Sequence, residues 1–228
     1  GVLQYSLSRN TEKFLFSGQS DITKENSSSS GMDSSETGEG GKINGQKDKL
    51  KVLITGASSY IGTSFEQYVA EHYGDTFFID TVDMKGDAWK DWDFSQYDIV
   101  FHVAGIAHAD VGRVTEETKA KYYTVNTKLA IEAAEKAKEE GVKQFIFMSS
   151  SIIYGDSAPY GTKKRITIDT EPKPANFYGD SKWQADKAIR KLAEKGFTVT
   201  IVRPPMIYGK DCKGNFPMLS RFAKKLPF

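Results

Sequence analysis

Two side chains able to exchange a proton with a substrate lie four residues apart, Tyr178 and Lys182 in the segment Tyr178-Gly179-Asp180-Ser181-Lys182. Residues at this spacing share one face of a helix, so the phenol and the ammonium are expected to be neighbours. A phenol with a pKa of about 10 is a poor base at neutral pH, and a nearby cation favours its phenolate. The pair indicates general acid–base chemistry; the alternative is an amphipathic ring at a helix start.

Hydroxyl groups precede this pair at the end of an apolar run. Ser149, Ser150 and Ser151 follow Phe145–Met148, whose composition is typical of a buried strand. The segment Arg203–Gly209 closes the next expected strand in the same manner. Both segments would bring polar groups to the carboxyl ends of neighbouring strands, where ligands of α/β proteins bind.

A glycine-bearing turn, Thr55–Gly62, lies between an apolar strand and an amphipathic helix. In such turns the glycines allow a tight bend, and the amides of the helix end receive a pyrophosphate. Ser59 stands where a middle glycine is usual, which predicts a slightly weaker or differently angled phosphate contact. An ordinary strand–helix turn is the alternative. The residues assigned to phosphate binding are Gly56, Ser58, Ser59, Tyr60, Ile61 and Gly62.

Two aspartates, Asp80 and Asp83, lie where an acid that binds the cofactor ribose is expected, roughly 20 residues beyond the turn. Asp83 is preferred because it follows the predicted strand Phe77–Val82, although both candidates stay open. Either carboxylate would accept a hydrogen bond from a ribose 2′-hydroxyl and repel a 2′-phosphate, which favours NAD over NADP. The alternative for each is a solvated turn aspartate.

Strands and helices alternate along the chain, which predicts an α/β fold with a doubly wound parallel sheet. Gly141 and Gly196 lie just past two of the expected helices, where a left-handed cap is favourable. The expected strands are Leu50–Thr55, Phe77–Val82, Asp98–Val103, Lys143–Met148 and Phe197–Arg203, and the expected helices are Tyr60–Tyr73, Thr115–Glu140, Tyr178–Lys195 and a short one at Met218–Lys225.

The composition divides the 228 residues into two parts. Residues 1–48 hold only 10 apolar residues, and 13 of the 25 residues from Ser17 to Gly41 are Ser or Gly. Such a segment buries too little apolar surface to fold, so residues 1–48 are predicted to be a disordered leader and linker, able to join an upstream domain. Residues 49–228 form the expected globular domain.

Several classes of protein are excluded by composition. The net charge of +1 gives no basic field for nucleic-acid binding, and the single Cys212 forms no internal disulfide. His102 and His108, with Asp110 nearby, lack the spacing and ligands of a metal site. With no membrane-spanning run and no signal peptide, we expect a cytoplasmic protein that binds neither nucleic acid nor membrane.

Five segments in order resemble the extended short-chain dehydrogenase/reductase superfamily, in its NAD-dependent epimerase/dehydratase branch. They are Thr55–Gly62, Asp98–Gly105, Phe145–Gly155, Tyr178–Lys182 and Arg203–Gly209, and the resemblance runs from about Lys51 to Gly209. It implies a Rossmann-like nucleotide-binding domain and NAD as cofactor. It also implies a smaller carboxy-terminal substrate domain that is largely missing here, so we expect this chain to bind dinucleotide but to turn over slowly.

The resemblance assigns roles residue by residue. Tyr178 would be the general acid or base, Lys182 would bind the nicotinamide ribose and lower the tyrosine pKa, and Ser150 would hydrogen-bond the reacting sugar oxygen. Asn126 would be the structural and proton-relay asparagine, or else a polar residue facing a neighbouring helix. The further cofactor contacts implied are Asp93 and Phe94 at the adenine, with Ala104, Gly105 and Pro204. Only three residues separate Phe94 from Asp98, so the helix usual there must be a turn or absent.

The reaction implied is carried out on nucleotide sugars. Dehydratases of the family resemble Thr-Asp-Glu where this chain has Ser150-Ser151-Ile152, and Ile152 has no proton to give. An enzyme similar to UDP-glucose 4-epimerase is therefore favoured, with transient hydride transfer at C4. The alternatives are a nucleotide-sugar or keto-sugar reductase, and a non-catalytic dinucleotide-binding sensor or scaffold. A homodimer is compatible with all three.

Overall fold

The computed structural model describes residues 48–107, 114–159, 161–212 and 215–225. The chain forms two units, the larger made of Asp48–Ile207 and Cys212–Phe228 and the smaller of Gly1–Lys47 and Tyr208–Asp211. In the smaller unit the described residues form a turn, in which Asp211 has a φ of 60°. The predicted leader and linker lie outside the described residues, apart from Asp48.

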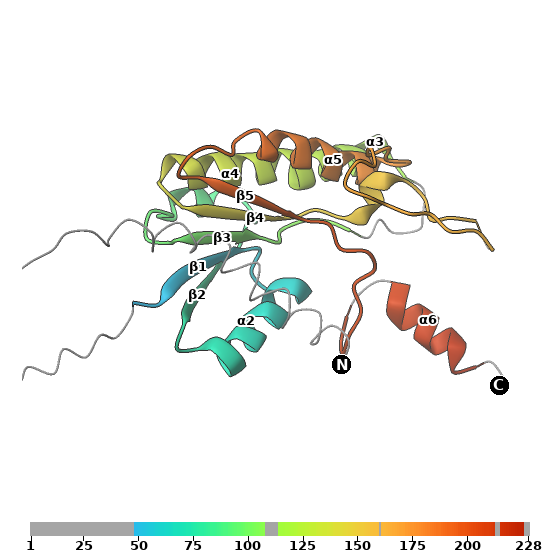
Figure 1. The fold of residues 1–228 in the computed structure, drawn as a ribbon, viewed down its shortest axis with the longest axis horizontal. Helices are drawn as coiled ribbons and strands as arrows, with labels where there is room; N and C mark the ends of the chain where they lie inside the picture. Colours follow the sequence, from blue (N-terminus) through green and yellow to red (C-terminus); the bar gives the residue numbers. More distant parts are fainter. Residues whose placement is uncertain (1–47, 108–113, 160, 213–214, 226–228) are drawn as a thin grey trace, which may run out of the picture. The chain divides into compact units, whose positions relative to one another are not determined.

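The larger unit is built on one sheet of five parallel strands in the order β2-β1-β3-β4-β5 (Figure 1). The strands are β1 (Leu50–Thr55), β2 (Phe77–Val82), β3 (Ile99–His102), β4 (Gln144–Met148) and β5 (Thr198–Val202). The predicted α/β fold is confirmed. The chain changes direction across the sheet between β1 and β3, and the crevice at such a switch point is where α/β sheets bind ligands.

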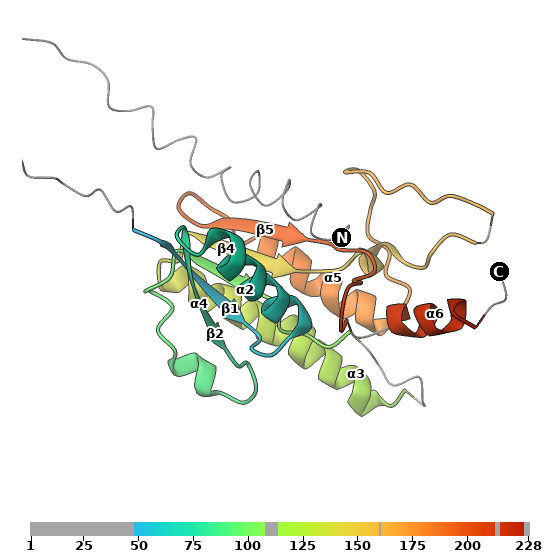
Figure 2. The same ribbon diagram turned by 90° about the horizontal axis from the view of Figure 1, so that it is seen from below.

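Helices cover both faces of the sheet. Figures 1 and 2 show α2 on one face and α4 and α5 together on the other. The helices are α2 (Tyr60–Tyr73), α3 (Glu116–Tyr122), the π-helical η2 (Tyr123–Lys128), α4 (Leu129–Glu139), α5 (Phe177–Arg190) and α6 (Asn215–Ala223), and single 3₁₀ turns lie at η1 (Ala88–Asp91) and η3 (Ser151–Tyr154). None of these described helices is long and apolar enough to span a membrane.

The main core lies between the sheet and the α4–α5 face. Four fully buried alanines line α4 at helical spacing, namely Ala130, Ala133, Ala134 and Ala137. Their small side chains let α4 lie close to the sheet, where Phe145 and Phe147 of β4 fill the space beneath it. This packing fixes α4 and α5 over the strand ends that carry the candidate site.

Two predicted helices differ from the structure. The expected helix Thr115–Glu140 is three segments, because η2 inserts a π-helical stretch between α3 and α4. The expected helix Tyr178–Lys195 ends at Arg190, because Glu194 and Phe197 exchange backbone hydrogen bonds of 3.1 and 3.0 Å around a tight turn before β5. Between β2 and β3 the single turn η1 stands in place of a longer helix, as expected.

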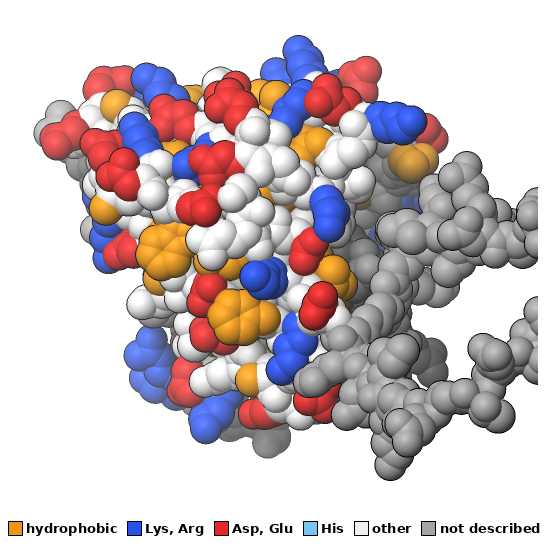
Figure 3. All heavy atoms as spheres, turned by 90° about the vertical axis from the view of Figure 1, so that its left-hand side faces the viewer, with side chains coloured by type: hydrophobic (Ala, Val, Ile, Leu, Met, Phe, Trp, Pro, Cys, Tyr) orange, Lys and Arg blue, Asp and Glu red, His pale blue; other side chains and the backbone are white. Residues whose placement is uncertain are grey.

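The face at the amino ends of the strands carries mixed charge. Figure 3 shows basic and acidic side chains interspersed over it, with apolar side chains between them. Phe78 of β2 and Trp92 after η1 are among the exposed apolar residues, at 48% and 40% exposure. The glycines and hydroxyls described next lie at the opposite, carboxyl edge.

Candidate active site

The first glycine of the turn brings two strand ends together at the switch point. Gly56 has a φ of 117°, and a Cβ placed on it would lie 2.7 Å from the backbone nitrogen of Ala104. The amides of Val103 and Ala104 both donate to Thr55 O, at 3.0 and 2.9 Å. A side chain at position 56 would therefore push β1 and β3 apart.

Ser59 is the N-cap of α2. Its Oγ accepts a hydrogen bond from Gly62 N at 3.0 Å, and a Cβ on Gly62 would approach that oxygen to 2.8 Å. The preceding Ser58 has a left-handed φ of 64°. The serine at the usual glycine position thus closes the first turn of α2, whose positive dipole end points to the crevice, an arrangement that suits an anionic group.

The two aspartates near the end of β2 have different surroundings. Asp80 is half-buried and accepts a hydrogen bond of 2.8 Å from Tyr97 Oη, which in turn accepts one of 3.2 Å from Trp92 Nε1. Asp83 is exposed at the carboxyl end of β2, and its Oδ1 accepts from the Lys85 amide at 3.0 Å. Because Val82 O accepts the amides of Gly56 and Ala57, Asp83 lies beside the phosphate turn.

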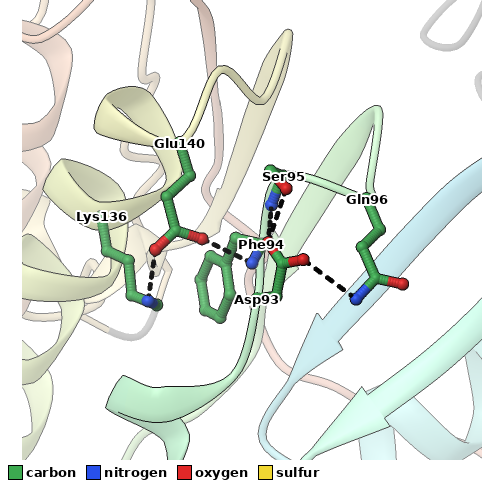
Figure 4. A network of polar contacts seen from close by, with 6 residues as sticks. All are labelled: Asp93, Phe94, Ser95, Gln96, Lys136 and Glu140. Carbon is green, nitrogen blue, oxygen red and sulfur yellow. Dashed lines mark hydrogen bonds and ion pairs between the residues drawn. The ribbon is translucent and has the colours of Figure 1, made fainter.

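Asp93 and Phe94, the predicted adenine pair, lie between η1 and β3 and next to the end of α4 (Figure 4). Phe94 is fully buried in the core, and its amide donates to Glu140 Oε2 at 2.5 Å, just beyond the carboxyl end of α4. The Asp93 carboxylate accepts from the amide and hydroxyl of Ser95, at 2.9 and 2.6 Å, and these hydrogen bonds lower its pKa. The ring, the amide and the carboxylate are all engaged near the amino ends of the strands, so we leave both residues out of the proposed cofactor site.

Tyr178 stands in the first turn of α5. Asn176 caps this helix by accepting from Gly179 N at 2.8 Å, and the ring of Tyr122 packs edge-on to Phe177 and Tyr178 with centroids 4.9 and 5.9 Å apart. Burial raises the pKa of Tyr178 above its usual value, and a side-chain hydrogen bond with Ser150 acts in the opposite direction. Ser150 is therefore near enough to Tyr178 to influence its ionisation.

Lys182 lies one helical turn after Tyr178 and is 5% exposed. Its Nζ donates to Met148 O at 3.0 Å and lies 5.0 Å from the centroid of the Phe147 ring. Burial lowers its pKa from 10.5 to about 8. A Cβ on Gly105 would come within 2.9 Å of this Nζ, so a side chain at position 105 would displace the ammonium.

Asn126 is fully buried in the π-helical segment η2. Its Oδ1 accepts from Ile106 N at 2.8 Å, and its Nδ2 donates to Ile106 O at 2.9 Å and to Ser181 Oγ at 3.2 Å. The amide therefore ties the segment after β3 to α5, between Tyr178 and Lys182. π-Helical turns occur often at functional sites.

The buried ammonium of Lys182 is the feature of the site that fits a bound dinucleotide. Lys182 is a buried cation that forms no ion pair with the described residues. Its Nζ faces Gly105, the residue after Ala104, and Gly56 of the phosphate turn packs against the Ala104 backbone. A buried ammonium without a counter-charge is costly unless a ligand supplies polar partners. Sugar hydroxyls and phosphates of a bound dinucleotide would do so.

Two residues at the edge of the site have structural contacts. Pro204 follows β5, and its carbonyl accepts from Ser151 N at 2.9 Å. His102, at the end of β3, is fully buried, pairs through Nδ1 with Thr55 Oγ1 at 2.8 Å and has its pKa lowered by burial to about 3. His102 is thus a neutral core residue, while His108 and Asp110 lie outside the described residues.

One buried charge near the site was missed by sequence analysis. Asp186 is fully buried on α5 and pairs with Arg203 at the end of β5. Its position four residues after Lys182, on the same stripe of the helix, is the signal that could have found it.

A parallel sheet with a glycine turn at its switch point, and a Ser–Tyr–Lys cluster at the neighbouring strand ends, defines a nucleotide-binding domain of the short-chain dehydrogenase/reductase type. The chain belongs to the NAD dependent epimerase/dehydratase family, whose model matches residues 52–226. The resemblance seen in the sequence is confirmed.

Individual relatives agree with this assignment. UDP-glucose 4-epimerase of Vibrio cholerae is 29% identical over 203 residues, which are 80% of this chain and 60% of the relative. The N-acetyl-alpha-D-glucosaminyl-diphospho-ditrans,octacis-undecaprenol 4-epimerase of Escherichia coli O157:H7 is 28% identical over 188 residues, 75% of this chain and 54% of the relative. The chain thus spans little more than half the length of these relatives.

A solved structure shares the fold. MoeE5 in complex with UDP-glucuronic acid and NAD superposes with a TM-score of 0.61 at 22% identity, covering 75% of this chain and 59% of MoeE5. At this identity the likeness concerns the fold alone.

Proposed function

We propose that the protein is an NAD-dependent nucleotide-sugar 4-epimerase in which Ser150, Tyr178, Lys182 and Asn126 form the catalytic set. The observation that carries the proposal is the convergence of Tyr178 on α5, Ser150 at the end of β4 and the buried Lys182. Family membership and two relatives named as 4-epimerases support the same reaction class.

Tyr178 moves the proton. Its phenolate would take the proton of the sugar 4-hydroxyl in the first half-reaction, and the phenol so formed would return that proton in the second, while Ser150 holds the same sugar oxygen by a hydrogen bond. When bound, NAD would accept the hydride of C4 and return it to the other face of the sugar. Because burial raises the pKa of Tyr178, its phenolate needs positive charge nearby in order to form at neutral pH.

Lys182 supplies positive charge and a fixed donor. Its Nζ uses one of three N–H donors on Met148 O, which leaves donors for the hydroxyls of a nicotinamide ribose. Asn126 holds the segment after β3 beneath that position through its two hydrogen bonds to Ile106. Asp83, exposed beside the phosphate turn, would accept from the adenosine ribose and disfavour a 2′-phosphate.

Epimerisation is favoured over dehydration, the other reaction in the family name. Elimination of water needs a further acid and base near C5 and C6 of the sugar. The residues after Ser150 are Ser151 and the aliphatic Ile152, which begin the turn η3. Because Ile152 has no proton to donate, it cannot serve as the additional acid, which favours hydride transfer at C4 alone over elimination of water.

The proposal is tested by replacing Tyr178 with Phe in the full-length protein. Interconversion of UDP-galactose and UDP-glucose should fall by about 10²–10⁴-fold while NAD binding changes little, because only the acid–base group is lost. Tyr73→Phe, which removes a phenol at the far end of α2, is the control. Retention of more than about a tenth of the activity in Tyr178→Phe would remove this residue from the mechanism, since the expected loss is far larger. Turnover that consumes added dinucleotide at every cycle would indicate a reductase.

A further inference from the structure

A buried ion pair joins α5 to the end of β5. The Asp186 carboxylate is fully buried and accepts from Arg203 Nε at 2.9 Å and from Arg203 Nη2 at 2.8 Å. This two-point contact fixes the orientation of both groups, as fork-like arginine–carboxylate pairs do. A buried ion pair often adds little to the stability of a fold. We therefore consider which groups this pair holds in position.

The two members of the pair contact the chain on either side of Ser150. Ser149 Oγ donates to Asp186 Oδ2 at 3.0 Å, one residue before Ser150. Arg203 Nη1 donates to Tyr154 Oη at 2.8 Å, four residues after it. The segment that presents the Ser150 hydroxyl is therefore held at both ends by one ion pair.

Backbone hydrogen bonds support the same segment from β5. Ser149 N donates to Val202 O at 2.8 Å and Ser151 N donates to Pro204 O at 2.9 Å, so the two acceptors flank Arg203 in the sequence. Between these points the Ser150 hydroxyl caps the turn η3 by accepting from Ile152 N at 3.3 Å. At the far end of η3 two side chains hold Tyr154, since its hydroxyl accepts from Arg203 and its carbonyl accepts from Lys164 Nζ at 2.6 Å.

Asp186 lies on the same helix as the candidate base. Tyr178, Lys182 and Asp186 recur every four residues along α5, so the helix that carries the phenol also carries the carboxylate. Arg203 and Asp186 thereby connect the helix of Tyr178 to the turn of Ser150. The same two elements are in direct contact, since a Cβ on Gly179 of α5 would lie 3.0 Å from Ile152 O of η3.

We propose that the Asp186–Arg203 pair, acting through Tyr154, is a positioning device that holds the Ser150 hydroxyl against the Tyr178 hydroxyl. Neither Arg203 nor Asp186 takes part in proton transfer. The inference rests on the proposed function of Ser150 and Tyr178, and it adds three residues that act through them. Displacement of a catalytic group by about 1 Å can cost 10²-fold in rate, so a small movement of η3 would be measurable.

Tyr154→Phe is the decisive variant because it removes the Arg203–Tyr154 hydrogen bond and leaves the buried ion pair intact. We expect kcat for 4-epimerisation to fall about tenfold, with KM and NAD affinity within about twofold of wild type. Arg203→Lys, which keeps the charge and loses the fork, should give a loss at least as large. Arg190→Gln is the matched control, since Arg190 contacts Asp186 at 3.2 Å from a half-exposed position and does not reach η3 in the described contacts.

A second readout does not depend on turnover. The ionisation of Tyr178 is followed by phenolate absorbance, as the difference between each protein and its Tyr178→Phe derivative. Loss of the Ser150 hydrogen bond should move the titration midpoint of Tyr178 upward in Tyr154→Phe and leave it unchanged in Arg190→Gln. A role confined to stability would lower the unfolding midpoint without moving this titration.

The outcomes separate the inference from the proposed function. Unchanged kcat and unchanged Tyr178 titration in Tyr154→Phe would overturn the positioning role, as would equal losses in Arg190→Gln and Arg203→Lys. If wild type shows no epimerase activity, the proposed function fails, and the shift of the Tyr178 titration still decides whether the pair positions Ser150.

Discussion

Replacing Lys182 with Met removes a buried ammonium that forms no ion pair with the described residues. Its pKa is lowered by burial from 10.5 to about 8, so charging this group disfavours the folded state. A tenfold change in proton affinity corresponds to about 1.4 kcal/mol, and the difference therefore costs about 3 kcal/mol below pH 8. Loss of the hydrogen bond to Met148 O offsets about 1 kcal/mol of the gain in the variant.

The sign of the pH dependence follows from proton counting. Below the folded-state pKa of about 8 both states hold the proton, and the full penalty acts on the wild type. Between 8 and 10.5 the unfolded chain keeps the proton that the folded chain has lost, so wild-type stability rises with pH. The advantage of Lys182→Met, about 2 kcal/mol at pH 7, should therefore shrink by about 2 kcal/mol near pH 9.5.

Urea unfolding of the cofactor-free protein at the two pH values measures this gap. Lys191→Met, which removes an exposed lysine next to α5, is the control and should show no comparable gap. The same Lys182→Met protein should bind NAD weakly and turn over at least about 10²-fold more slowly. A gap that is constant with pH, or a variant less stable than wild type at both values, would refute the idea that Lys182 is kept charged at the expense of stability.

Four further substitutions test the proposed cofactor site. Asp83→Ala should weaken NAD binding by about tenfold or more in calorimetry, since a charged hydrogen bond is lost, whereas Asp80→Ala should chiefly lower stability because Tyr97 loses its acceptor; tighter binding of NADP than NAD by wild type would contradict the assignment. Gly105→Ala should cut turnover about tenfold or more with normal circular dichroism, because its Cβ would meet Lys182 Nζ at 2.9 Å and Asn126 Oδ1 at 3.1 Å; wild-type turnover would show that the ammonium is free to move. Asp93→Ala should change NAD affinity by less than about twofold, because this carboxylate holds Ser95; a larger loss would restore it as an adenine contact.

The fold was predictable because each local signal agreed with the others. The strand Leu50–Thr55, the helix Tyr60–Tyr73 and the strand Phe77–Val82 have the bounds expected from apolar periodicity. The π-helical break at Tyr123–Lys128 was not predictable, because the contacts made there are tertiary. Buried Asn126 binds Ile106 and the Ser181 hydroxyl, and buried Thr127 donates to the Ser181 carbonyl. Nothing in the periodicity of the segment marks that change.

The candidate site was predictable where the chemistry is local. The sequence alone shows the one-turn spacing of Tyr178 and Lys182 and the glycine at position 56. Asp80 and Asp83 were indistinguishable until the contact of Asp80 with Tyr97 was known. Asp93 and Phe94 had the residue types of an adenine contact, but the short connection through η1 leads them to Glu140 at the other edge of the sheet.

We infer that the protein holds NAD and uses it without net consumption. The most direct measurement is denaturation of full-length protein, purified without added cofactor, followed by identification and quantification of the released dinucleotide. We predict NAD in amounts close to one per chain, in a preparation that already interconverts UDP-galactose and UDP-glucose. Release of NADP, or no dinucleotide from a preparation that is active only when one is added, would contradict the account.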